Sequence, residues 1–319
     1  MCRAVRLRRL AAGSRSQLLS LVVALSAATT GMCSDVATPA PPPRPSVALA
    51  DILKNSSAGE WRQPDPAHTL YMDLGSGRVV IELAPQFAPL HVENIQLLVR
   101  EGYFDGLAIV RVQDNYVTQW GDADGTRPLR SAKLKLAPEF TRSPAESLHF
   151  TRLTDGDVYA PQVGFVDGFP AARDPRSNTA WLVHCYGMVG AGRDNDVDTG
   201  NGAELYAVNG SPTRHIDRNA ALVGRVLKGM DLLSSLPRGT GEGLGMYEKR
   251  EQRVPIIRVR LAADAPESDR VRLEVLRTES QSFQAILEWR RHRHDDWYKV
   301  SAGRVDVCNV PIPVRVIGQ

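Results

Sequence analysis

The clearest pattern along the chain is a pair of alternating apolar and polar runs within residues 69–83. The sequence there is TLYMDLGSGRVVIEL, and Gly75-Ser76-Gly77 joins the two runs. Alternation with a period of two is typical of strands that bury one face, and glycine-rich turns favour hairpins. The segment therefore predicts a β-hairpin.

The following segment changes to helical periodicity. Pro89 suits a first helical turn, and Gly102 stands where a helix commonly ends. Between them, apolar residues repeat at helical spacing: Val92, Ile95, Leu98 and Val99. This pattern predicts one helix.

The rest of the central region consists of short apolar runs. They predict strands at residues 107–112, 116–119, 180–186, 204–208, 221–226 and 255–261. A second helix fits residues 229–236, and the stretch from Thr126 to Asn178 is a polar, Gly- and Pro-rich excursion with some local structure. Many short strands without βαβ alternation favour a mainly β fold, an antiparallel barrel or sandwich with helices at its ends.

The chain beyond Pro266 predicts a helical C-terminal extension. In Ser280–Arg293, with the sequence SQSFQAILEWRRHR, Phe283, Ile286 and Leu287 share one helical face. The helix either packs on the body and completes its core, or presents an interaction surface. His292, His294, Asp295 and Asp296 follow one another at its end, which we interpret as a solvated helix terminus rather than a metal site.

The first residues have the pattern of a secretory leader. An arginine-rich start precedes the apolar run LLSLVVALSAA at residues 18–28. Eleven residues are too few to cross about 30 Å of hydrocarbon, so export to the periplasm is predicted rather than a membrane span. Cys33 stands where a bacterial lipoprotein is acylated, although Met32 is bulkier than the usual preceding residue. A lipid anchor at Cys33 is the one membrane attachment that the sequence allows.

A proline-rich spacer follows the leader. The sequence VATPAPPPRPSV at residues 36–47 favours extended polyproline II structure. The predicted organisation is a leader at residues 1–33, a linker at 34–66, a folded domain at 67–263 and an extension at 264–319. The sequence gives no indication of the oligomeric state.

Composition and charge exclude several classes of protein. The 319 residues are 43% hydrophobic and 24% charged, which is typical of a globular chain and not of a disordered, collagen-like or multi-span one. The net charge is +3, but five arginines lie in residues 1–33, and the remainder carries 34 basic and 36 acidic side chains. The body of the chain therefore has no excess of basic residues that would indicate a nucleic-acid partner.

Three cysteines lie outside the start of the leader: Cys33, Cys185 and Cys308. Their spacing matches no zinc motif, so no metal site is predicted. In an oxidising compartment Cys185 and Cys308 would pair and tie the C-terminal segment to the body, while two isolated buried thiols explain the sequence equally well.

Four blocks of sequence resemble the cyclophilin-type peptidyl-prolyl isomerases in order and spacing. They are residues 77–121 (GRVVIELAPQFAPLHVENIQLLVREGYFDGLAIVRVQDNYVTQWG), 187–193 (GMVGAGR), 201–208 (NGAELYAV) and 215–233 (HIDRNAALVGRVLKGMDLL). The resemblance runs from Thr69 to Ala262 and is interrupted by an insertion at about residues 123–186.

The resemblance implies an eight-stranded antiparallel β-barrel capped by two helices, with an outer groove for proline peptides and no cofactor. It implies isomerisation of Xaa-Pro bonds, with unfolded or folding polypeptides as partners. Arg111 matches the family's catalytic arginine, and Gln119 matches the glutamine beside it. The residues that match substrate-binding positions are Tyr116, Val117, Val189, Gly190, Glu204, Tyr206, His215 and Ile216.

Three departures from the family pattern bear on activity. Glu204 replaces a glutamine, Ala220 replaces a histidine, and Ile109-Val110 replaces a Phe-His pair. A carboxylate at Glu204 would either pair with Arg111 and orient it or compete with the peptide carbonyl. The departures leave one alternative function, a non-catalytic proline-peptide-binding or chaperone module.

Overall fold

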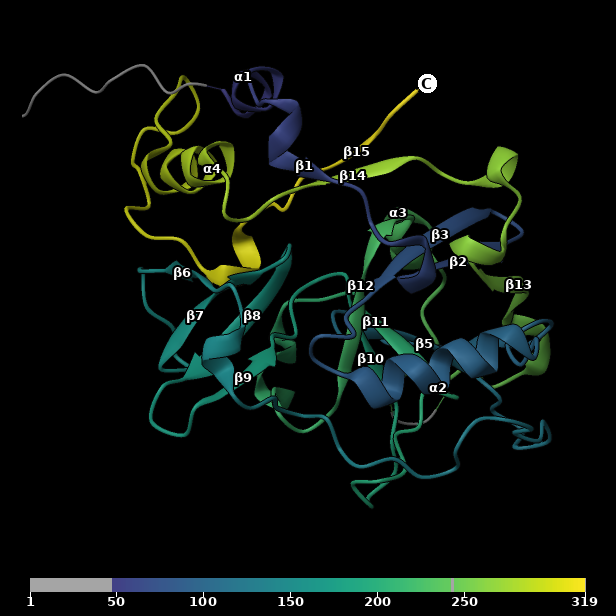
Figure 1. Ribbon diagram of the computed structural model, residues 1–319. Helices are drawn as coiled ribbons and strands as arrows, with labels where there is room; N and C mark the ends of the chain where they lie inside the picture. Colours follow the sequence, from purple (N-terminus) through teal and green to yellow (C-terminus); the bar gives the residue numbers. More distant parts are fainter. Residues whose placement is uncertain (1–47, 242–243, 319) are drawn as a thin grey trace, which may run out of the picture. The chain divides into compact units, whose positions relative to one another are not determined.

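A closed barrel of eight antiparallel strands lies at the centre of the fold, seen in the computed structural model of Figure 1. The structure describes residues 48–241 and 244–318. Around the barrel the strands follow the order β10-β11-β5-β4-β13-β2-β3-β12. Their bounds are β2 (Thr69–Leu74), β3 (Gly77–Leu83), β4 (Ala108–Val112), β5 (Val117–Gly121), β10 (Met188–Ala191), β11 (Leu205–Val208), β12 (Leu222–Lys228) and β13 (Val254–Leu261). The predicted fold class is confirmed.

The predicted hairpin is the β2–β3 pair, in register from Thr69 opposite Glu82 to Leu74 opposite Gly77. Alternate residues of β3 enter the barrel core, where Val79, Ile81 and Leu83 are buried. The two residues between them, Val80 and Glu82, belong to the opposite face of the strand. The period-two alternation of the sequence therefore corresponds to a strand with one face inside the barrel and one face outside it.

Two helices cap the barrel. In α2 (Pro89–Arg100), the periodic residues Val92, Ile95, Leu98 and Val99 are all buried against the barrel core. Gly102 follows with φ +70°, a left-handed conformation that glycine adopts without a steric penalty. The second cap is the short helix α3 (Met230–Ser234). No helix among the described residues is long and apolar enough to cross a membrane.

The insertion contains its own four-stranded antiparallel sheet. Its strands are β6 (Thr151–Leu153), β7 (Gln162–Val166), β8 (Phe169–Asp174) and β9 (Thr179–Leu182). Phe165, Phe169 and Trp181 form a core that continues onto the outer barrel surface, where it includes Val117 and Tyr206. The insertion is therefore packed behind two of the candidate binding residues.

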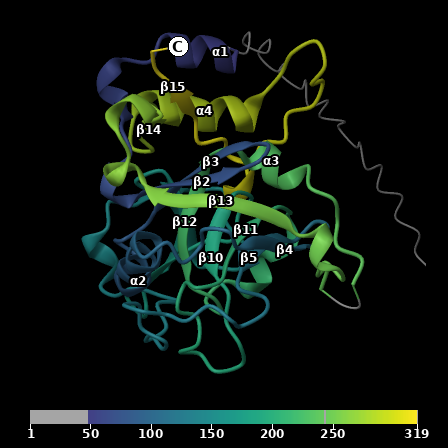
Figure 2. The same cartoon turned by 90° about the vertical axis from the view of Figure 1, so that its right-hand side faces the viewer.

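A third sheet joins the two ends of the described chain. It contains β1 (Trp61–Arg62), β14 (Leu273–Leu276) and β15 (Val314–Val316), with β14 in the middle. Beside it lie α1 (Leu49–Lys54) and α4 (Gln281–His292), and Figure 2 shows these helices together above the barrel. Short 3-10 turns complete the structure at Ala58–Glu60, Pro66–His68, Ala145–Ser147, Pro212–Ile216, Arg250–Gln252, Ala262–Asp264, Glu267–Asp269 and Val307–Asn309.

The predicted linker at residues 34–66 is too long at its C-terminal end. Residues 48–66 are folded, because Ile52 and Trp61 find apolar partners in the core that α4 shares with the insertion. Neither the segment around Ile52 nor the segment around Trp61 has enough apolar residues to form a core alone, so the hydrophobic pattern gave no sign that residues 48–66 are structured. The predicted leader, the lipid-anchor cysteine Cys33 and the rest of the spacer lie outside the described residues.

The C-terminal extension belongs to the same compact unit as the barrel. Phe283, Ile286 and Leu287 of α4 are fully buried, and the Phe283 ring meets Phe165 of the insertion edge-on with centroids 5.0 Å apart. A disulfide joins Cys185 to Cys308. Of the alternatives left open by the sequence, the structure has the paired cysteines and the helix that completes a core.

Candidate active site

A cavity of about 640 Å³ opens between strands β4, β5, β10 and β11 and the turn before β12. Six of the ten candidate residues line it: Arg111, Tyr116, Val117, Gln119, Tyr206 and Ile216. These residues come from four separate segments of the sequence. The fold therefore brings the predicted basic, amide, aromatic and aliphatic groups to one place.

A β-bulge directs Arg111 to this cavity. In the β4–β5 pair Ile109 lies opposite Trp120, but Arg111 lies opposite Gln119, so Val110 is the extra residue. Ile109 and Trp120 both point into the barrel core. Without the bulge, Arg111 would follow Ile109 into the core; the extra residue places it on the outer face beside Gln119.

Protein acceptors hold the Arg111 guanidinium in place. Its Nε donates to the backbone oxygen of Leu244, one terminal nitrogen donates to Gln113 Oε1, and the other donates to Gln119 Oε1 at 3.1 Å. Its charge also lies over the Tyr116 ring, 5.4 Å from the centroid. An arginine side chain carries five N–H groups, so two remain for a bound peptide.

Glu204 contacts the arginine through Gln119. The Gln119 side-chain Nε2 donates to Glu204 Oε2 at 2.8 Å while its Oε1 accepts from Arg111. Burial raises the pKa of Glu204, and the hydrogen bond from Gln119 offsets only part of this effect. The carboxylate therefore fixes which end of the amide faces Arg111, and it lies behind the cavity wall rather than in the cavity.

Tyr206 forms the buried floor of the cavity and is fixed through its hydroxyl group. The hydroxyl oxygen is 2.9 Å from His184 Nε2, and His184 Nδ1 is 2.9 Å from Asp217 Oδ1. A carboxylate on Nδ1 holds the ring proton there, which leaves Nε2 to accept from the tyrosine. The Tyr206 ring therefore has one fixed orientation.

The same chain of polar groups continues into the insertion. Arg214 Nε donates to Asp217 at 2.7 Å, and its two terminal nitrogens donate to both oxygens of Asp157 at 2.9 and 2.8 Å. Burial acts to raise the pKa of Asp217, but the hydrogen bonds from His184 and Arg214 outweigh it and lower the pKa below its ordinary value. We call Tyr206, His184, Asp217, Arg214 and Asp157 the floor network.

The predicted backbone platform at Val189 and Gly190 does not line the cavity. Val189 is fully buried inside the barrel, and Gly190 lies under the Tyr206 ring, where a Cβ atom would come within 2.3 Å of the hydroxyl oxygen. The wall is formed two residues later, by Ala191, Gly192 and Arg193. The cavity wall is thus formed by the last three residues of the GMVGAGR motif rather than by its middle residues.

Two further candidates lie beside the cavity rather than in its wall. His215 is exposed and stacks on Tyr116 with ring centroids 6.3 Å apart, and Glu204 lies behind Gln119. A further residue, Arg193, was not predicted as a site residue; it lines the cavity and donates to the Asn219 backbone oxygen at 2.8 Å. His184 and Asp157 were not predicted either, because no spacing in the sequence links them to Tyr206.

Among residues 48–241 and 244–318, no three His, Cys, Asp or Glu side chains are grouped so as to hold a metal ion. The chemistry available in the cavity is that of a fixed guanidinium, an amide and an apolar pocket.

Comparisons with known proteins agree on one family. The sequence model described as "Cyclophilin type peptidyl-prolyl cis-trans isomerase/CLD" matches residues 69–261. A probable peptidyl-prolyl cis-trans isomerase of Brucella suis is 26% identical over 200 residues, covering 63% of this chain and 85% of the relative. The human peptidyl-prolyl cis-trans isomerase-like 1 is 24% identical over 206 residues, which is 65% of this chain and 94% of the relative.

A solved structure is similar over most of the chain. The crystal structure of cyclophilin AquaCyp293 from Hirschia baltica aligns with a TM-score of 0.66 and 27% sequence identity. The alignment covers 85% of this chain and 97% of that one. It therefore extends beyond the region that the family model matches.

Proposed function

Since the chain belongs to the cyclophilin-type peptidyl-prolyl cis-trans isomerase family and isomerises Xaa-Pro peptide bonds, we propose that it does so in the cavity around Arg111. The observation that carries this assignment is the fixed guanidinium. Three of its donors are held by the protein, beside the apolar side chains Val117 and Ile216 and the Tyr206 ring.

The reaction requires a donor that acts on the twisted amide. Rotation about a peptide bond costs about 18–20 kcal/mol because the nitrogen lone pair is delocalised into the carbonyl group. As the bond twists, the lone pair localises on the prolyl nitrogen and becomes a hydrogen-bond acceptor. A guanidinium hydrogen bond that forms only in this state lowers the barrier, because it stabilises the transition state more than either planar isomer.

The surrounding residues hold the proline ring and keep Arg111 in place. Val117, Tyr206 and Ile216 provide the apolar surface that holds the proline ring still while the preceding residue rotates. Gln119 keeps one edge of Arg111 in place, and Glu204 keeps Gln119 in place. Arginine suits this task because its charge persists at every physiological pH and its donors have fixed directions.

We further propose that the protein is exported and acts on folding polypeptides in the cell envelope. The leader pattern at residues 1–33 supports export, and the Cys185–Cys308 disulfide is consistent with it because disulfides persist in oxidising compartments. Cell fractionation and the mass of the mature protein test this proposal. Mass spectrometry would distinguish cleavage after residue 28 from acylation at Cys33.

Exchange NMR of a short Xaa-Pro peptide tests the assignment of Arg111. We expect the protein to accelerate exchange and Arg111→Ala to reduce kcat/KM roughly 100-fold, as is typical when one transition-state donor is removed. Arg111→Lys keeps the charge but loses the planar fork, so it should recover only part of the loss. Arg100→Ala removes an arginine from the exposed side of α2 and should have no effect.

Two results would overturn the assignment. If Arg111→Ala keeps the activity of the parent, the catalytic donor is another group. If the parent binds proline peptides but accelerates no exchange over a panel of residues before proline, the barrel is a non-catalytic binding module.

A further inference from the structure

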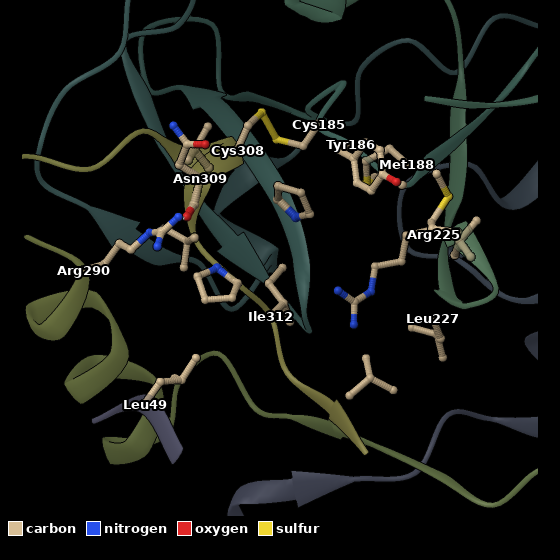
Figure 3. A pocket seen from close by; sticks show the side chains of 18 of the residues that line it. Leu49, Cys185, Tyr186, Met188, Arg225, Leu227, Arg290, Cys308, Asn309 and Ile312 are labelled. Atoms are coloured by element: carbon tan, nitrogen blue, oxygen red, sulfur yellow. Dashed lines mark hydrogen bonds between the residues drawn. A yellow bond between two sulfur atoms is a disulfide. The ribbon is translucent and has the colours of Figure 1, made fainter. Parts of the chain in front are cut away.

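A second cavity, of about 590 Å³, is lined in part by the disulfide cysteines Cys185 and Cys308 and shares no lining residue with the isomerase cavity. One wall is formed by β10 and β12, and the opposite wall by residues 307–314 together with Trp289 of α4. Figure 3 shows the Cys185–Cys308 disulfide at one edge of this space, which we call the disulfide cavity. Its volume is in the range of small-molecule sites.

An incompletely paired arginine projects into the disulfide cavity. The Arg225 side chain is 9% exposed, and in Figure 3 it extends into the space between Ile312 and Leu227. Its Nε and Nη2 are buried and have no hydrogen-bond partner. Buried donors are almost always satisfied in proteins, so these two call for an explanation.

The nearest carboxylate is committed to another arginine. Both oxygens of Glu82 accept from Arg62, at 2.5 and 3.1 Å, whereas Arg225 Nε is 4.0 Å from the nearer oxygen. Two arginines therefore share one carboxylate, which leaves one positive charge in excess. Burial lowers the pKa of Arg225 to about 10, so the guanidinium still keeps this charge at neutral pH.

Apart from Tyr186 and Asn309, the other side chains of the cavity wall are apolar or basic. Leu227, Met230 and Ile312 provide aliphatic surface, and Arg290 is the second charged residue of the wall. Among the described residues that line the cavity, none is Asp or Glu. A water molecule could accept a hydrogen bond from Arg225, but it would not neutralise the charge.

We propose that the disulfide cavity binds an amphipathic organic anion, whose carboxylate pairs with Arg225 and whose hydrocarbon part lies against Leu227, Met230 and Ile312. Such a ligand supplies both features that the cavity lacks, an anionic acceptor and an apolar occupant. Arginine–carboxylate pairs are strong because the planar guanidinium donates parallel hydrogen bonds. This binding is separate from isomerisation and needs none of the residues assigned to that reaction.

Titration calorimetry with sodium decanoate, below its micellar concentration, tests the proposal. We expect one decanoate to bind per chain, and decanol or acetate to bind at least ten-fold more weakly, because each lacks one half of the ligand. Arg225→Met should reduce decanoate affinity at least ten-fold. Since Arg62 and Glu82 then form a balanced pair, the variant should fold, and unchanged isomerase activity verifies this.

A second variant protects the test from a folding failure. Ile312→Trp adds volume to the cavity wall and leaves Arg225 in place, so it should also reduce decanoate binding. The proposal is wrong if the parent does not bind decanoate, if decanol binds as tightly, or if both variants bind as the parent does. Equal binding of acetate and decanoate would likewise contradict it, because a simple anion site needs no apolar wall.

Discussion

At the scale of single residues, the feature that distinguishes the isomerase cavity is the line from Glu204 through Gln119 to Arg111. The sequence suggested that the carboxylate would act on the arginine directly. Instead the amide stands between them, with its nitrogen towards Glu204 and its oxygen towards Arg111. Glu204 is thus a positioning residue, which acts on the reaction through Gln119.

Glu204→Gln should change the pH dependence of stability. The pKa of Glu204 is raised above its ordinary value of 4.5, so as the pH rises the unfolded chain loses this proton first. The free energy of unfolding therefore falls between pH 4.5 and the raised pKa, and stays reduced above it. We expect the variant to gain stability relative to the parent between pH 4 and pH 7, measured by urea unfolding.

Activity provides the control for this variant. Glutamine still offers an oxygen to Gln119, so kcat/KM should stay within a few-fold of the parent, whereas Glu204→Ala leaves the amide without its acceptor and should lower it further. A stability difference that is the same at pH 4 and pH 7 would show that Glu204 does not titrate as described.

Tyr206→Phe should separate the two roles of the floor tyrosine. The ring remains, so proline binding and kcat/KM should stay within a few-fold of the parent. The hydroxyl is lost, and His184 Nε2 is left buried without its partner, which costs about 1–3 kcal/mol of stability. Urea unfolding measures this loss, and an unchanged midpoint would mean that the floor network does not contribute to stability.

The residues that the sequence could predict were those carried by continuous motifs. Arg111, Tyr116, Val117 and Gln119 lie within nine residues, so their spacing fixes them. The position of the cavity wall within GMVGAGR was two residues wrong, because the motif does not show which of its residues enter the barrel. Asp157 and His184 were out of reach, because only the folded insertion brings them to Tyr206.

At the scale of secondary-structure elements, periodicity identified what could form locally. The β2–β3 hairpin and α2 bury their own apolar stripe against the barrel, and both were predicted close to their observed bounds. The strands β7 and β8 were missed. Their segment lies in a polar, turn-rich stretch. Phe165 and Phe169 become core residues only when α4 and the barrel surface pack against them.

The disulfide links two such elements, the strand region before β10 and the turn at Val307–Asn309. Replacing both Cys185 and Cys308 with serine opens a loop of 123 residues and should lower the free energy of unfolding by about 2–5 kcal/mol. Urea unfolding under non-reducing conditions measures the change. A reducing agent should lower the stability of the parent to that of the variant and leave the variant unaffected; equal midpoints for all samples would contradict a structural role.

At the scale of the whole molecule, the barrel, insertion and extension form one compact unit. The core of the insertion includes α4 residues on one side and Val117 and Tyr206 of the isomerase cavity on the other. A substitution in the C-terminal extension should therefore affect the active site by lowering the stability of the shared core rather than by touching the bound peptide.

Phe283→Ala tests this coupling. Removing a fully buried aromatic ring should cost about 3–5 kcal/mol, and thermal unfolding should remain a single transition in which isomerase activity is lost. Trp297→Ala is the matched control, because Trp297 is 79% exposed and should change stability by less than about 0.5 kcal/mol. Two separate calorimetric transitions, with activity surviving the first, would show that the extension is independent of the barrel.

The sheet formed by β1, β14 and β15 has a consequence for biosynthesis. Trp61 pairs with Leu276, and the third strand of the sheet, at Val314–Val316, leaves the ribosome more than 250 residues after β1. Trp61 therefore lacks its strand partners until all eight barrel strands, within residues 69–261, have been synthesised. The three-stranded sheet therefore cannot be complete until residue 316 has been synthesised, and until then the growing chain exposes apolar surface that can aggregate.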